Sequence, residues 1–134
     1  MIIAGVADTH AAIWYLFDDA RLSQAAGDFI DHAAAMGRSI AVSSISLAEI
    51  VYLVEKGRLT SNVYPDVKAA LADREHVFQE VALTVEVVDV MHRVARAAVP
   101  DMPDRIVAAT AIAFNVPVIS RDGRIRTSTV QTIW

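Results

Sequence analysis

Short apolar runs alternate along the chain with longer segments in which apolar residues recur at helical spacing. The short runs predict strands at residues 2–7, 39–43, 81–85, 116–120 and 129–134. In the second of these, Ile40 and Val42 fall on one face, because side chains alternate along a strand. The pattern therefore favours a chain in which strands and helices follow one another.

The helical segments are bounded by residues that commonly begin and end helices. Ser23 is one N-cap candidate, and Ser44 or Ser46 is another; with Ser46 as the cap, Glu49 would complete a capping box. Two prolines break the chain before the last helix, and Asn115 is a C-cap candidate at its end. We predict helices at residues 9–17, 23–36, from 44 or 46 to 57, from 65 to 71 or as far as 78, 86–98 and 104–115.

Strands that alternate with helices form mainly parallel sheets, covered by helices on both faces. We therefore predict an α/β fold of three layers with a central, mostly parallel sheet. No repeat, linker or low-complexity segment divides residues 1–134, so we expect one domain. In such folds ligands bind at the carboxyl ends of the strands, near the point where the strand order reverses.

Composition favours a globular protein outside the membrane. Hydrophobic residues make up 54% of the chain, yet no apolar run approaches the roughly 18–20 residues that a membrane span needs. The first residues lack the basic start of a signal peptide, and there is no cysteine for disulfides, thiolate metal sites or cysteine nucleophiles. We expect a cytoplasmic protein with no membrane contact.

The charge balance argues against an ordinary nucleic-acid-binding surface. The chain has 12 Lys and Arg against 16 Asp and Glu, a formal net charge of −4, whereas nucleic-acid binders are usually basic. The objection weakens if four acids are metal ligands, because the other 12 acids (16 − 4) then equal the 12 bases. A bound divalent cation would also provide positive charge where a phosphate approaches.

Four acids from distant segments fall where the predicted fold would bring them together. Asp8 and Asp122 follow predicted strands, and Glu49 and Asp104 lie in the first turns of predicted helices. Carboxylates are the ligands that Mg²⁺ and Mn²⁺ prefer, and such an ion can activate water for attack on a phosphodiester. Without metal the clustered acids would repel one another, and at least one pKa would rise.

Each of these acids also has an interpretation without function. Asp8 could simply cap the next helix, and Glu49 could complete a capping box. Asp104 could favour a helix start through the helix dipole, and Asp122 could be an ordinary turn residue. Since acids at strand ends occur in many α/β proteins, spacing alone leaves the metal site as one possibility among others.

Five segments carry a specific order of motifs. Residues 6–14 read VADTHAAIW, 43–50 read SSISLAEI, 101–111 read DMPDRIVAATA, 118–122 read VISRD and 130–134 read VQTIW. Together they resemble the four acidic motifs and the closing strand of PIN-domain proteins of the VapC toxin type. Each motif alone is weak, but the ordered set covers nearly the whole chain. Met102 and Pro103 stand where the family more often has Pro-Phe, a mild departure.

The resemblance implies a PIN-like fold and a ribonuclease that depends on Mg²⁺ or Mn²⁺. It assigns metal binding and catalysis to Asp8, Glu49, Asp104 and Asp122. Hydrolysis by water would leave a 5′-phosphate and a 3′-hydroxyl, because the 2′-hydroxyl is not the nucleophile. The resemblance also implies a homodimer and a small antitoxin that blocks the site.

Other polar residues near the same edge are candidates for supporting or substrate-binding roles. The hydroxyls of Thr9 and Ser120 could orient a carboxylate or a water, or bond only to the local backbone. Asp101 could assist the site or only shape its loop, and we expect His10 to pack or support rather than act as a base. We expect Trp14 in the core or in a dimer contact. Arginines that could hold RNA phosphates, or pair with acids, are Arg105, Arg121, Arg124 and Arg126.

Two other classes of function stay open. A catalytically inactive PIN-type binding module would share the fold, although all four acids are present here. The other class is a small α/β metal-dependent phosphatase, or a phospho-accepting receiver domain on a similar scaffold. A haloacid-dehalogenase-type phosphatase has Asp-x-Asp after the first strand, whereas this chain has His10 at the position of the second Asp. A receiver domain needs a lysine late in the chain, and no lysine follows Lys68. No P-loop motif is present.

Overall fold

Strand β1 (Ile3–Ala7) is the central strand of the sheet. Val6 and Ala7 are fully buried, as expected for a strand that is covered on both faces. In this computed structural model, which describes residues 2–126, 128 and 130–134, five strands run parallel in the order β3-β2-β1-β4-β5. The other four are β2 (Ser39–Ser43), β3 (Phe78–Val81), β4 (Val118–Ile119) and β5 (Thr132–Ile133).

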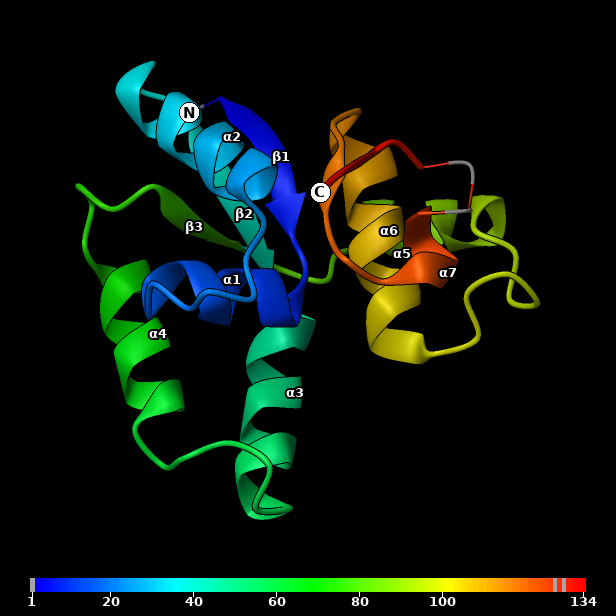
Figure 1. Ribbon diagram of the computed structural model, residues 1–134. Helices are drawn as coiled ribbons and strands as arrows, with labels where there is room; N and C mark the ends of the chain where they lie inside the picture. Colours follow the sequence, from blue (N-terminus) through cyan, green and yellow to red (C-terminus); the bar gives the residue numbers. More distant parts are fainter. Residues whose placement is uncertain (1, 127, 129) are drawn as a thin grey trace.

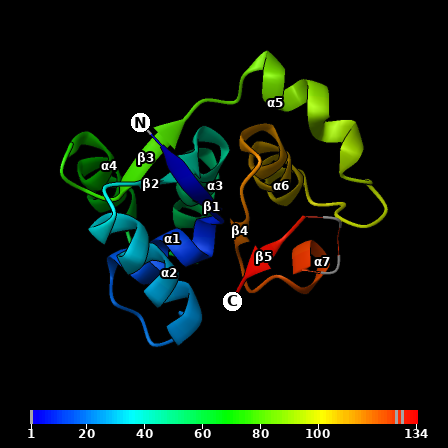
Figure 2. The same cartoon turned by 90° about the horizontal axis from the view of Figure 1, so that it is seen from above.

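Helices cover both faces of this sheet, so the predicted three-layer α/β fold is confirmed (Figure 1, Figure 2). α1 (Thr9–Leu16) and α2 (Gln24–Ala35) lie on one face. The other face carries α5 (Val85–Val90), the 3-10 helix η1 (Met91–Arg93), α6 (Met102–Phe114) and α7 (Gly123–Arg126). α3 (Ser44–Glu55) and α4 (Val63–Ala72) extend past the carboxyl ends of the strands (Figure 1).

Apolar side chains form one cluster on each face of the sheet and a third beyond its edge. Ile40 and Val42 of β2 share the face covered by α2, as predicted, and pack with Ile30. On the opposite face Val6 packs with Val107 of α6. The third cluster joins α1, α3 and α4 and contains Ile13, Trp14, Ile50, Val63 and Val67. This cluster fixes α3 relative to α1, and both helices contribute to the site described below.

The strand order reverses between β1 and β4. From β1 the chain adds β2 and then β3 on one side, and after α6 it returns to add β4 and β5 on the other. Ala7 pairs with Ile119 of β4 at the end of the two strands. The chain leaves these two strands toward opposite sides of the sheet, and such a point forms a crevice for ligands.

Most predicted elements are found within a few residues of their expected bounds, but the capping of α3 was predicted wrongly. Ser43, and neither Ser44 nor Ser46, caps this helix: its Oγ accepts a hydrogen bond from the Ile45 amide at 3.2 Å. Glu49 is therefore in the second turn and not in a capping box. Ser46 is fully buried inside the helix.

The region from 63 to 98 differs most from expectation. α4 begins at Val63 and ends at Ala72, and Phe78 begins β3, so the predicted strand at 81–85 lies three residues too late. Phe78 is 2% exposed and pairs with Ile40 of the neighbouring strand, and this burial decides its conformation. The predicted helix at 86–98 is instead α5 followed by η1.

The last long helix and the last strand lie close to their predicted bounds. Asn115 ends α6 in the left-handed conformation with φ 55°, as its C-cap assignment predicted. The predicted strand at 129–134 is found as β5, and Thr129 lies outside the described residues. Among the residues that the structure describes, no helix has both the length and the apolar character needed to cross a bilayer.

Candidate active site

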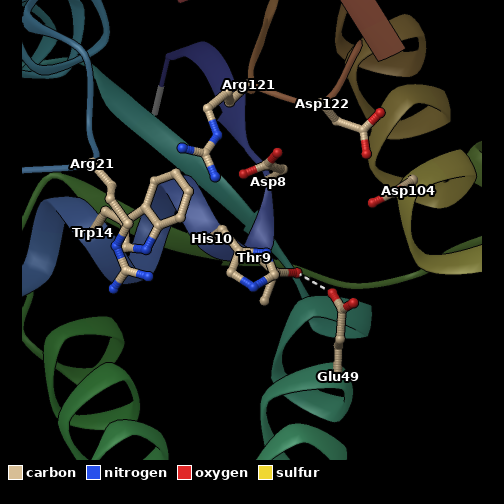
Figure 3. Close-up of a pocket in the computed structure, with 9 residues that line it drawn as sticks. All are labelled: Asp8, Thr9, His10, Trp14, Arg21, Glu49, Asp104, Arg121 and Asp122. Carbon is tan, nitrogen blue, oxygen red and sulfur yellow. Dashed lines mark hydrogen bonds between the residues drawn. The ribbon is translucent and has the colours of Figure 1, made fainter. Parts of the chain in front are cut away.

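A pocket of about 300 Å³ opens at the carboxyl ends of β1 and β4, and all four predicted acids line it (Figure 3). They come from four separate segments, after β1, in α3, in α6 and after β4. The full lining is Asp8, Thr9, His10, Trp14, Arg21, Glu49, Asp104, Arg121 and Asp122. The structure thus brings together residues that are up to 114 positions apart (122 − 8).

Asp8 is positioned by the junction of β1 and α1. It follows the last strand residue, is 9% exposed, and caps α1 by accepting a hydrogen bond from the Ala11 amide at 2.8 Å. Burial raises the pKa of Asp8, although hydrogen bonds from Ser120 and Ala11 oppose that rise. The capping role considered for Asp8 is therefore real and coexists with its place in the pocket.

Glu49 is held in the pocket by a side chain of the first motif. The Thr9 hydroxyl donates a hydrogen bond to Glu49 Oε1 at 2.5 Å, joining α1 to α3 (dashed line in Figure 3). Thr9 is 4% exposed and Glu49 is half-buried, so this contact is partly shielded from water. Of the two roles foreseen for Thr9, the structure shows orientation of a carboxylate.

Asp104 carries the strongest electrostatic signature of the site. Burial, together with the charges of Asp101, Asp122, Glu49 and Asp8, raises the pKa of Asp104 to about 8. Its backbone amide donates to Asp101 Oδ2 at 3.1 Å, which makes Asp101 the N-cap of α6. Asp101 does not line the pocket; it shapes the helix start and adds negative charge near Asp104.

Asp122 and Ser120 form a tight turn after β4. The Asp122 amide donates to Ser120 Oγ at 3.0 Å, and Asp122 Oδ1 accepts from the Arg124 amide at 2.8 Å. Ser120 is fully buried, and its side chain also bonds to Asp8. A single hydroxyl therefore links the acid after β1 with the turn that carries the acid after β4.

The donor chemistry of this pocket suits a hard divalent cation. All four acids offer oxygen, which Mg²⁺ and Mn²⁺ prefer. Burial and then the charges of neighbouring acids raise the pKa of Asp104, and a cation would offset both effects. Within residues 2–126, 128 and 130–134, no three His, Cys, Asp or Glu side chains are grouped closely enough to hold one ion directly. An ion held partly through water would fit this spacing, since Mg²⁺ usually keeps several waters.

One wall of the pocket is cationic and aromatic. Arg121 and Arg21 lie over the Trp14 ring, with their guanidinium carbons 4.6 and 5.1 Å from its centroid, and the His10 ring centroid is 5.6 Å from that of Trp14. Trp14 belongs to the core, as predicted. Arg21 was missed as a pocket residue, because nothing in the sequence between α1 and α2 indicates that this loop returns to the site.

The other arginines foreseen near this edge do not line the pocket. Arg105 turns toward η1: its Nε donates to the Val94 carbonyl at 2.8 Å and its terminal nitrogen donates to that of Met91 at 3.1 Å. Arg124 and Arg126 lie on the short α7. Only Arg121 of the four named arginines is a lining residue.

Comparisons with known proteins agree with the geometry. Residues 6–128 match the family model of the PIN domain. Ribonuclease VapC22 of Mycobacterium tuberculosis is 31% identical to the chain over 119 residues, 89% of this chain and 87% of that protein. VapBC2 from Rickettsia felis, solved bound to a DNA fragment from its promoter, has a TM-score of 0.69 at 16% identity. A toxin–antitoxin complex from Klebsiella pneumoniae has a TM-score of 0.65 at 18% identity, and both matches cover 98% of this chain and 97% of the other chain. At these identities the two structures show likeness of fold alone.

Proposed function

The chain belongs to the PIN domain family as a VapC-type member, and from that premise we propose that it is a metal-dependent endoribonuclease, the toxin of a toxin–antitoxin pair. The observation that carries this proposal is the pocket in which four carboxylates from four segments surround one space at the strand-order reversal. Such a cluster is costly without a cation and useful with one. Residues 1–134 would act as one nuclease domain.

The residues that would hold Mg²⁺ or Mn²⁺ are Asp8, Glu49, Asp104 and Asp122, directly or through water. The bound ion would activate water and stabilise the charge that develops at the scissile phosphate. Thr9 orients Glu49, and Ser120 orients Asp8, so both carboxylates are fixed before a substrate arrives. Burial and the neighbouring acids raise the pKa of Asp104 to about 8, and a bound cation would favour its ionised form as a ligand.

Two kinds of protein partner belong to the proposal. We infer a small antitoxin that blocks the pocket, and a homodimer. The surface offers apolar area for such contacts: Tyr52 on α3 is 55% exposed and Val85 on α5 is 71% exposed. RNA, the substrate of a toxin of this kind, is in the cytoplasm, and we propose that location for the chain.

The test is cleavage of a panel of labelled RNAs by purified chain free of antitoxin, with Mg²⁺, with Mn²⁺ and with EDTA. Asp8→Asn is the site variant, because asparagine can still cap α1. Asp28→Asn, on the exposed face of α2, is the matched control. We expect cutting with metal only, a loss of at least about 100-fold in Asp8→Asn, and wild-type rates in the control.

The chemistry of the ends tests the mechanism separately. Attack by water leaves a 5′-phosphate and a 3′-hydroxyl, whereas a cyclic 2′,3′-phosphate would exclude the proposed reaction. Cutting that survives in Asp8→Asn would place the active site elsewhere. If no RNA is cut with either metal while a phosphomonoester is hydrolysed, the phosphatase alternative replaces the proposal; if neither is cut, the binding module does.

A further inference from the structure

The cationic wall of the pocket, made of Trp14, Arg21 and Arg121, has no role in holding a metal ion. It faces the carboxylates across the same space: Figure 3 shows Arg121 directed from the Asp122 side toward the Trp14 ring. A substrate bound to the acids must therefore pass beside two guanidinium groups. RNA is a polyanion, and the chain has a net charge of −4, so local positive charge in this position matters for binding.

Core packing holds the Trp14 ring, on which the two arginines of the wall lie. Trp14 is 5% exposed and packs with Ile13 and Ile50 in the cluster between α1, α3 and α4. The Trp134 ring, with its centroid 6.0 Å from that of Trp14, supports it from the end of the chain. A buried and packed indole offers the guanidinium groups a fixed surface, and a preformed binding group loses less entropy when a ligand arrives.

The two arginines differ in whether a carboxylate already pairs with their guanidinium group. Arg21 is paired with Asp19 through two hydrogen bonds, Nε to Oδ1 at 3.0 Å and a terminal nitrogen to Oδ2 at 2.7 Å. Arg121 is exposed, and in the described part of the chain it forms no ion pair. Its donors are therefore available to an incoming anion, and Arg21 can contribute only with its remaining donors.

We propose that Arg121, assisted by Arg21, binds a phosphate of the RNA backbone next to the scissile phosphate, and so positions the substrate strand across the carboxylates. The inference rests on the proposed ribonuclease function and adds the residues that select a polyanionic strand. A planar guanidinium stacked on an indole presents its N–H edge outward, in the geometry that two phosphate oxygens accept. The pocket would thus have a cleavage side, formed by the four carboxylates, and a phosphate-binding side, formed by the cationic wall.

The wall binds a phosphate and not a stacked base. Trp14 has almost no exposed surface, and guanidinium groups already lie over its ring. Base stacking needs an open aromatic face. Binding through the phosphate is independent of sequence, so this contact should set affinity and salt dependence without setting which base is read.

The experiment measures RNA affinity in the Asp8→Asn background, where binding is separated from cleavage, using fluorescence anisotropy from about 50 to 200 mM salt. Arg121→Ala is expected to raise Kd about 10-fold and to reduce the salt slope by about 0.7, the value for one phosphate contact on a single strand. Arg121→Lys should fall between, because lysine keeps the charge and loses the planar fork. Arg21→Ala should have the smaller effect.

Arg58→Ala is the matched control, since Arg58 is also exposed but lies in the loop after α3 and does not line the pocket. In the cleavage-competent chain, Arg121→Ala should raise KM about 10-fold and leave kcat within about 3-fold. Thermal unfolding of each variant checks that a truncated side chain has not altered the fold.

The failure of this inference can be told apart from that of the proposed function. If the wild-type chain cuts RNA but Arg121→Ala matches Arg58→Ala in Kd and salt slope, the inference is overturned and the ribonuclease stands. If nothing is cut but Arg121→Ala still weakens RNA binding, the phosphate-binding wall stands and the nuclease fails. RNA that does not bind in any background overturns the inference.

Discussion

At the scale of single residues, the site is an arrangement of carboxylates whose negative charges are incompletely balanced. Two of the acids are fixed by neutral partners: Asp8 by Ser120 and an amide, and Glu49 by Thr9. These partners orient the oxygens without neutralising them. Burial and, after it, the charges of the neighbouring acids raise the pKa of Asp104 to about 8.

The raised pKa of Asp104 leads to a prediction about the stability of the fold without metal. Because the folded-state pKa of Asp104 lies above its ordinary value of 3.8, ionisation is more costly in the folded chain than in the unfolded one. The contribution of the protonated carboxyl to stability is therefore full below about pH 4 and is lost as pH rises through about 8. Asp104→Asn removes the cost, so in EDTA it should be more stable than wild type, increasingly so from pH 5 to pH 8.

Thermal unfolding in EDTA and in Mg²⁺ measures this effect. Solvent screens part of the repulsion, so we expect a gain of about 1 kcal/mol at pH 8, or about 3–5 °C in Tm. With Mg²⁺ the wild-type chain should gain stability and Asp104→Asn should gain little. A wild-type chain that is as stable as Asp104→Asn at pH 8 in EDTA would contradict the prediction.

At the scale of elements, the site depends on how the segment before α6 is held. The segment that connects β3 to α6 consists of α5, η1 and a loop at residues 94–101. This loop lies outside the helices and strands. Arg105, next to Asp104, donates to the carbonyls of Met91 and Val94 and so attaches this segment to α6. The carbonyl contacts give Arg105 a structural role, whereas the sequence also allowed contact with the substrate.

Substitution of Arg105 distinguishes the two roles. Arg105→Gln removes charge-assisted hydrogen bonds to two carbonyls, and we expect a loss of about 2 kcal/mol in the free energy of unfolding, measured by urea denaturation. RNA affinity of the folded variant should stay within about 2-fold, in contrast to Arg121→Ala. A variant with normal stability and weakened RNA binding would instead make Arg105 a substrate contact.

At the scale of the whole molecule, the pocket exists because the strand order reverses between β1 and β4. Ile119 pairs with Ala7 at that junction and is fully buried beside α2, one residue before Ser120. The packing of the sheet and the position of the acids therefore depend on the same short strand. β4 is two residues long, and both residues are fully buried between β1 on one side and β5 on the other.

Ile119→Ala tests this dependence. Removing a buried isoleucine should lower the free energy of unfolding by about 2–4 kcal/mol in urea denaturation, through lost burial and the cavity left behind. Met36→Ala is the control, because Met36 is 57% exposed and should change stability by less than about 0.5 kcal/mol. An Ile119→Ala chain within 1 kcal/mol of wild type would show that β4 is not essential to the fold.

The sequence by itself determined the alternation of strands and helices, the ends of several of them, and which four acids line the pocket. Ser23 and Asn115 cap helices as predicted, because capping is decided by hydrogen bonds over a few residues. The alternation of Ile40 and Val42 likewise predicts one buried face without knowledge of distant parts.

Only the tertiary structure decided which distant groups meet. Phe78 entered a strand because it is buried against β2, and the helix predicted at 86–98 became the shorter α5 followed by η1, packed against α6. The placement of Arg21 in the pocket and of Arg105 outside it depends on how loops return to the sheet. Local propensity differs between alternatives by about 1 kcal/mol or less per residue, so burial of a single large side chain outweighs it, and burial depends on residues far away in the sequence.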